Sequence, residues 1–224
     1  MASGIVEFQR SKPLPSGPGW RSPGGDGIGR GDDGDGASRG PIPLHTYYTG
    51  LWLALAAVTM FFVGLTSALV VRRGISSDWT GIALPRILFV NTLVLAASSF
   101  LLERTRRRLR SLPCGKDARL RGRFGAVLLL GLAFLAGQLG AWRELAAHGI
   151  FLGTNPSSSF IYLLTAAHGL HLAGGLIAIT WVALRARSLA ASTRGRTVVG
   201  VVAIYWHFMG ILWIYIVALL KLNM

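Results

Sequence analysis

The chain of 224 residues is 52% hydrophobic and only 14% charged, and its mean hydropathy is +0.50. Soluble domains carry about a quarter charged residues, so this composition argues against a soluble enzyme and for a membrane protein. The net charge of +14 would suit nucleic-acid binding, but the basic residues gather in the segments between apolar stretches, which argues against a nucleic-acid partner.

Residues 1–43 form a polar segment that precedes the first apolar stretch. The run SGPGWRSPGGDGIGRGDDGDGASRGPIP is rich in Gly, Pro, Ser and Asp, and cannot bury enough apolar surface to offset the entropy lost on ordering. Its GDDGDG portion lacks the closing Glu and the flanking helices of a calcium-binding EF-hand. We therefore expect a disordered cytoplasmic tail over 1–43 and a membrane domain over 44–224.

Five apolar stretches follow in chain order. Each has about the 20 residues that an α-helix needs to cross a hydrocarbon core about 30 Å thick. A helix satisfies its own backbone hydrogen bonds, which a lipid-facing strand does only in a closed barrel. We predict an all-α membrane protein, a bundle of five transmembrane helices, over roughly residues 51–71, 82–102, 124–142, 160–184 and 198–220.

The basic residues lie mostly on one side of this bundle. With the N-terminus inside, 18 of the 23 Lys and Arg residues fall on the cytoplasmic side, including the cluster ERTRRRLR at 103–110. The positive-inside rule therefore predicts a cytoplasmic N-terminus and a periplasmic C-terminus. The cluster is expected to meet anionic lipid headgroups.

Ionisable groups inside a bilayer are costly and usually functional. All nine carboxylates of the chain lie in the tail, in loops or at helix ends, with Glu103 at the edge of the second stretch. A proton relay through this chain alone would therefore lack its usual carriers. The single cysteine, Cys114, lies in a loop, so neither a disulfide nor a cysteine metal site is expected.

Two histidines, His168 and His171, stand in the apolar run LTAAHGLHLAGGLIAI at 164–179. They are three residues apart, so they project about 60° apart from one helix and cannot flank one haem iron. His207 in the fifth stretch makes a three-histidine metal site geometrically possible, but no acid or cysteine supports it. We favour packing, with hydrogen bonds across helices to Ser, Thr or backbone groups. We expect no catalytic, cofactor-binding or metal-binding residue in this chain.

Small and aromatic residues indicate how the helices associate. Small residues let membrane helices approach closely, and they recur at helical spacing in the third and fourth stretches: Ala133, Ala136, Gly137 and Gly140, then Gly169, Ala173, Gly174 and Gly175. The aromatic residues of YWHFMGILWIYI at 205–216 could line a ligand pocket, or could pack and anchor the helix at the interface. We favour packing for them: Trp206, Phe208, Trp213 and Tyr215.

Five stretches, in this order, resemble subunit III of the haem-copper oxidases in its five-helix form. They cover about residues 46–222. The first two, GLWLALAAVTMFFVGLTSALVVRRG (50–74) and NTLVLAASSFLLERTRR (91–107), resemble the W-L-x-x-A-S-E-x-M-F-F and N-T-x-x-L-x-S-S helices of the family. The others are a loop, GIFLGTNPSSSFIY (149–162), an H-G-x-H helix, FIYLLTAAHGLHLAGG (160–175), and a W-H-F helix, YWHFMGILW (205–213).

This resemblance implies a non-catalytic subunit of a bacterial terminal oxidase, a cytochrome c oxidase, in the inner membrane. It implies that the chain packs on subunit I, within a complex that includes subunit II. The family also holds phospholipid in a cleft between helix bundles and supports proton uptake and durability during oxygen reduction, while haem and copper lie in subunits I and II. The residues carried over by motif, as structural or interface positions, are His168, Gly169, His171, Trp206 and His207.

Two positions depart from the family pattern. Val58 stands where the first helix of the family carries a glutamate, and Gly210 stands where an aspartate follows the W-H-F motif. We therefore expect no role that depends on those carboxylates. The resemblance also allows subunit III of a quinol oxidase, because subunit II sets the electron donor, or an accessory subunit of nitric oxide reductase. Alternatives of a different class are a small transporter and a haem-carrying membrane protein, against which the missing carboxylates and histidine pairs count.

Overall fold

The structure is a computed structural model that describes residues 43–75, 85–111 and 120–223. In these ranges the chain forms six α-helices and no strand: α1 (Leu44–Ile75), α2 (Ile87–Ser111), α3 (Leu120–Ala147), α4 (Pro156–Leu184), α5 (Ala186–Ala190) and α6 (Thr193–Asn223). Among these helices, the five long ones are each long and apolar enough to cross a membrane, which confirms the predicted spans. The tail predicted over 1–43 lies, apart from Pro43, outside the described residues, as does Cys114.

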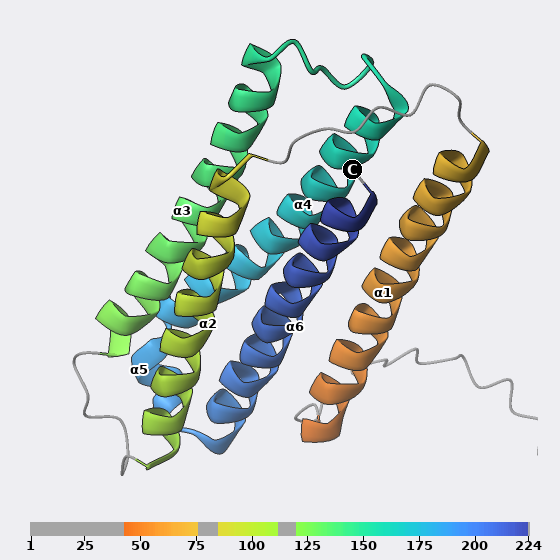
Figure 1. The fold of residues 1–224 in the computed structure, drawn as a ribbon. Helices are drawn as coiled ribbons and strands as arrows, with labels where there is room; N and C mark the ends of the chain where they lie inside the picture. The colour runs from red at the N-terminus through yellow and green to blue at the C-terminus, as the bar shows by residue number, and fades with distance from the viewer. Residues whose placement is uncertain (1–42, 76–84, 112–119, 224) are drawn as a thin grey trace, which may run out of the picture. The chain divides into compact units, whose positions relative to one another are not determined.

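Four of the long helices surround a common core. Helices α2, α3, α4 and α6 each contact the next around a closed ring, and α1 lies beside α6 and α4 (Figure 1). The short α5, which the sequence did not predict, packs between the ends of α3, α4 and α6. The described spans thus form a four-helix core with α1 packed against its outer side.

The buried residues of α2 and α3 follow a coiled-coil spacing of alternating three and four residues. Along α2 they are Leu88, Asn91, Leu95, Ser98, Leu102, Thr105 and Leu109. Along α3 they are Leu120, Phe124, Val127, Gly131, Phe134, Gln138, Ala141 and Leu145. A period of 3.5 residues keeps one face of a helix against its neighbour over the whole length. These two helices accordingly share the most extensive helix contact among the described elements.

Three buried polar residues, seven positions apart, interrupt the apolar face of α2. Asn91 Nδ2 donates to the Phe134 carbonyl of α3 at 3.3 Å, and Thr105 Oγ1 donates to Leu101 O at 2.8 Å. Ser98 Oγ accepts the indole N–H of Trp206 at 2.7 Å. In an apolar surrounding an unpaired polar group is costly, and these contacts give each of the three a partner.

Close helix approach uses some of the predicted small residues. A methyl group at Gly175 would lie 3.1 Å from Tyr205 Cε1, and one at Gly137 would overlap the Asn91 amide. The prediction is wrong for Gly174, where nothing lies within 4 Å, because this position points away from the described helices. Gly131, which the sequence did not single out, approaches the W-H-F motif most closely among the glycines: a methyl there would lie 2.9 Å from Trp206 Cη2 and 2.6 Å from Leu176 Cδ2.

The connection from α3 to α4 is held by local polar contacts. Gly149 has a φ of 74°, a left-handed conformation typical of the residue after a helix, and Ile150 N donates back to Leu145 O at 3.0 Å. Pro156 opens α4, and Ser158 Oγ accepts the backbone N–H of Asn155 at 3.2 Å as half of a capping box. These contacts determine where α4 begins. They therefore also determine how far along the bundle His168 and His171 lie.

Candidate functional site: the bundle centre and the groove between α2 and α6

Trp206 of the W-H-F motif lies at the centre of the bundle with no exposed surface. Its indole N–H reaches Ser98 on α2, its ring lies over Gly175 on α4, and a methyl at Gly131 on α3 would lie 2.9 Å from its Cη2 atom. One side chain therefore joins α6 to three neighbouring helices. Because it is fully buried within this chain, Trp206 is a packing residue rather than an interface residue.

His168 of the H-G-x-H motif is also fully buried. Its ring packs against two aromatic rings that also contact each other, with centroid distances of 5.8 Å to Phe134 on α3 and 5.1 Å to Trp213 on α6. Neither ring nitrogen has a hydrogen-bond partner among the described residues. The predicted hydrogen bond across helices is wrong here, because this side of α4 faces aromatic rings and the Trp213 N–H is directed to Thr92 Oγ1 instead.

His171, the second histidine of the motif, faces α1. Its ring centroid lies 5.9 Å from Phe61 and 5.7 Å from Phe62, and its Nδ1 lies 2.7 Å from Ala167 O of its own helix. The prediction of an interhelical bond from this ring is therefore also wrong. The bond across helices at this residue uses its backbone, because Tyr205 Oη donates to His171 O at 2.9 Å. A rotation of about 60° thus places the two histidines against different helices.

Gly169, between the two histidines, makes no tight contact. A methyl group there would lie 3.8 Å from Leu135 Cδ2, which is an ordinary van der Waals distance. Packing within the chain therefore does not require glycine at this motif position.

His207, the third motif histidine, lies at the edge of the bundle and pairs with an acid. Its Nε2 is 3.5 Å from Glu103 Oε2 on α2, and the His207 side chain is 32% exposed. The same carboxylate is 2.9 Å from Nε of both Arg106 and Arg107. Across the described ranges, no three His, Cys, Asp or Glu side chains come together as metal ligands could, so the three-histidine site is not formed there.

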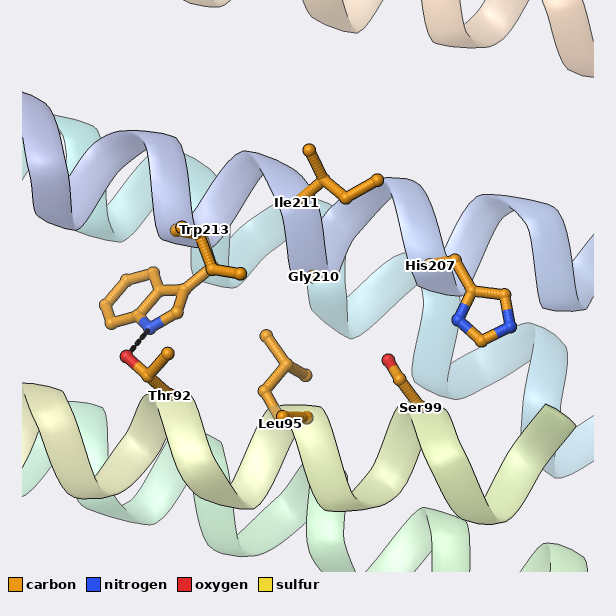
Figure 2. Close-up of a pocket in the computed structure, with 9 residues that line it drawn as sticks. Thr92, Leu95, Ser99, His207, Gly210, Ile211 and Trp213 are labelled. Carbon is orange, nitrogen blue, oxygen red and sulfur yellow. Dashed lines mark hydrogen bonds between the residues drawn. The ribbon is translucent and has the colours of Figure 1, made fainter. Parts of the chain in front are cut away.

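A groove of about 310 Å³ runs between α2 and α6 beside this pair (Figure 2). Figure 2 shows Ser99 facing His207 near one end and a hydrogen bond of 3.0 Å from Trp213 Nε1 to Thr92 Oγ1 at the other. Gly210 lies midway and presents no side chain, so the groove stays open there. Its lining is otherwise mainly apolar: Thr92, Leu95, Ala96, Ser99, His207, Gly210, Ile211, Trp213 and Ile214.

Both departures from the family pattern occupy apolar surroundings. Val58 is buried in the hydrophobic core, where α1 meets the bundle. A methyl group at Gly210 would lie 3.5 Å from Ser99 Oγ, so glycine is not required there for space. Within the described ranges the carboxylates are Glu103, eight residues before the end of α2, and Glu144, three residues before the end of α3.

No protein-family model matches the chain, but curated relatives do. It is 32% identical over 178 residues to cytochrome c oxidase subunit 3 of Synechocystis sp., covering 77% of this chain and 74% of that protein. It is 31% identical over 176 residues to cytochrome c oxidase subunit 3 of Thermostichus vulcanus, covering 76% and 84%. The chain belongs to the cytochrome c oxidase subunit III family. This subunit III is a multi-pass protein of the bacterial inner membrane.

Family membership counts against the small transporter and the haem-carrying membrane protein as alternatives. In the structure two of the five motif residues, His168 and Trp206, lie in the core, His171 packs against α1, Gly169 has only an ordinary contact with Leu135, and His207 lies at the rim of the groove. Reasoning from the sequence missed Ser98 and Gly131, the partners of Trp206. The sequence did carry a signal for Ser98: polar residues recur every seven positions along α2, at Asn91, Ser98 and Thr105, which predicts that they share one buried face.

Proposed function

We propose that this subunit III serves a cytochrome c oxidase as a non-catalytic subunit that packs on subunit I. The observation that carries the proposal is the family membership. The burial of Trp206 and His168 inside the chain supports a scaffolding role, because both side chains are engaged in holding the bundle together. In this proposal haem and copper belong to subunits I and II, and this subunit supports proton uptake and durability during oxygen reduction.

The surface of α1 supports the proposed contact with a larger membrane subunit. Helix α1 packs on α6 and α4, and much of its remaining surface is apolar and exposed within this chain. In a membrane such side chains meet lipid or another protein. The exposed large residues of this helix include Trp52, Leu53, Met60, Phe61 and Val63.

A tagged full-length chain tests the assignment directly. Purified in mild detergent from its own membranes, it should bring down haem-containing subunits, and the complex should oxidise reduced cytochrome c while consuming oxygen. Oxidation of quinol in place of cytochrome c would identify a quinol oxidase, and consumption of nitric oxide would identify a nitric oxide reductase. A chain that purifies without any haem protein would contradict an oxidase role.

Removal of the subunit tests the supporting role. The complex without this chain should still reduce oxygen at first, but its activity should decline with successive turnovers faster than that of the complete complex. Adding the purified chain back should restore the slower decline. Equal decline in both complexes would contradict the role in durability, while leaving the assignment to the complex intact.

The groove between α2 and α6 supports a phospholipid as the bound lipid. Its lining on α2 runs from Thr92 to Ser99, seven residues at 1.5 Å each or about 10 Å, which is about a third of the thickness of a hydrocarbon core of about 30 Å. A helix is 10–12 Å wide and does not enter a groove of about 310 Å³, whereas an alkyl chain does. The groove therefore has the width of an acyl chain and can hold part of its length.

The charges at the end of the groove favour an anionic headgroup. The face of α2 that carries Ser99 and Glu103 continues, one turn further, to Arg106 and Arg107. The Arg107 side chain is 78% exposed although its Nε contacts Glu103, so its other nitrogens are accessible to a phosphate. Basic residues at the membrane surface attract anionic lipids by about 1 kcal/mol each.

Filling the groove tests this part of the proposal. Gly210→Leu should lower the amount of anionic phospholipid that remains with the purified complex, measured by mass spectrometry of extracted lipids. The matched control is Gly174→Leu, where nothing lies within 4 Å, and it should leave the lipid content unchanged. Equal lipid content in Gly210→Leu and the wild type would contradict a lipid in this groove.

A further inference from the structure

Two fully buried side chains of the bundle have no hydrogen-bond partner for any of their polar side-chain atoms among the described residues. His168 on α4 has no exposed surface, and Gln138 on α3 is 3% exposed. The unpartnered atoms are both ring nitrogens of the histidine and both amide atoms of the glutamine. Buried polar groups in native proteins are nearly always paired with protein or with ordered water, so four such atoms require an explanation.

The register of α3 against α4 brings these two side chains to neighbouring levels. Phe134 of α3 lies against His168, with ring centroids 5.8 Å apart, and Trp142 Nε1 of α3 donates to Thr165 Oγ1 at 3.1 Å. Gln138 is four residues from both Phe134 and Trp142, so it occupies the turn between them on the same side of α3. Its amide therefore lies at the level between Thr165 and His168.

The polar groups nearest to this level are already engaged. Thr165 Oγ1 donates to Ile161 O at 2.6 Å while it accepts the Trp142 N–H. The Trp213 N–H is directed to Thr92, and Asn91 Nδ2 is directed to the Phe134 carbonyl. The imidazole is fully buried against the mutually contacting rings of Phe134 and Trp213, so it has little freedom to turn toward a different partner.

We infer that Gln138 and His168 bind a buried water molecule between α3 and α4. A neutral imidazole offers one donor and one acceptor, and an amide offers two donors and an acceptor, which complement the two donors and two acceptors of water. A neutral ligand fits because neither described carboxylate, Glu103 on α2 or Glu144 on α3, is a hydrogen-bond partner of Gln138 or His168. Buried waters occur about once per 27 residues and make about three hydrogen bonds each.

A structure of the complete oxidase complex, at a resolution that shows ordered water, tests the inference on the unaltered protein. Density is expected within hydrogen-bonding distance of both the Gln138 amide and the His168 imidazole. A Gln138 amide that contacts the imidazole directly, with no density between them, would overturn the inference. The inference would also be overturned if the Gln138 and His168 side chains pointed into separate apolar surroundings.

A double-mutant cycle in the assembled complex provides a second test. Gln138→Leu and His168→Phe each remove one side of the water site and leave the other polar side chain without its ligand. In the double variant neither polar side chain remains, so no buried polar group is left without a partner. Its drop in Tm should therefore be smaller than the sum of the two single drops. The matched control pairs Gln138→Leu with His171→Phe on the α1-facing side of α4, and those drops should add. Additive drops for Gln138 and His168 would overturn the shared site.

Discussion

The indole N–H of Trp206 on α6 donates a 2.7 Å hydrogen bond to the hydroxyl of Ser98 on α2. Both side chains have no exposed surface, so neither can exchange this bond for one with water. The bond therefore fixes which face of α6 meets α2 and, through the ring of Trp206, where α3 and α4 pack. Two residues that are 108 positions apart in the chain thus define the centre of this subunit III.

Ser98→Ala should destabilise the subunit by about 1–3 kcal/mol, because it leaves the buried Trp206 N–H without an acceptor. Thermal unfolding of the purified complex, followed by release of this subunit, measures the effect. Ser99→Ala is the matched control, since Ser99 is the adjacent hydroxyl and is only partly buried at the groove. Equal effects of the two substitutions would show that the bond to Trp206 contributes nothing particular.

Gly131→Ala should destabilise the bundle, because the added methyl would lie 2.6 Å from Leu176 Cδ2 and 2.9 Å from Trp206 Cη2. Forcing extra atoms into a packed core costs typically about 1–3 kcal/mol. Gly174→Ala, with nothing within 4 Å, should be neutral or stabilising by up to about 1 kcal/mol, the difference in helix propensity. Thermal unfolding of both variants checks the contrast, and an unchanged Gly131→Ala protein would contradict it.

A hydrophobic carbodiimide should leave the membrane-embedded part of this subunit unlabelled. The reagent reacts with neutral carboxyl groups in apolar surroundings, whereas Glu103 lies close to Arg106, Arg107 and His207, which favour its ionised form. Val58→Glu should create a labelled site, because position 58 is only 8% exposed. Peptide mass spectrometry locates the label. A labelled helix in the unaltered chain would show that Glu103, or another group, is reactive.

A reporter fused after Met224 should be active on the periplasmic side of the membrane. The reason is that 18 of the 23 Lys and Arg residues fall on one side when the N-terminus is cytoplasmic. A reporter inserted between α2 and α3 is the internal control and should be active in the cytoplasm. Cytoplasmic activity of the C-terminal fusion would contradict the predicted orientation.

Much of this protein could be predicted from the sequence because helix formation in a membrane is a local matter. Each span satisfies its own backbone, so a run of about 20 apolar residues is sufficient to identify it. The same reasoning placed Glu103 at the edge of the second span, but α2 continues for eight residues beyond it to Ser111. The motifs around His168 and Trp206 indicated the family, which the curated relatives confirm.

Only the tertiary structure decided which side chains are partners. His168 and His171 look alike in the sequence, yet His168 packs against aromatic rings of α3 and α6 and His171 faces α1. Ser98 meets Trp206, and Phe134 meets His168, because of how far each helix is rotated and shifted against its neighbours. Rotation and shift depend on how side chains interlock across several helices at once, and hydropathy along one chain segment does not contain that information.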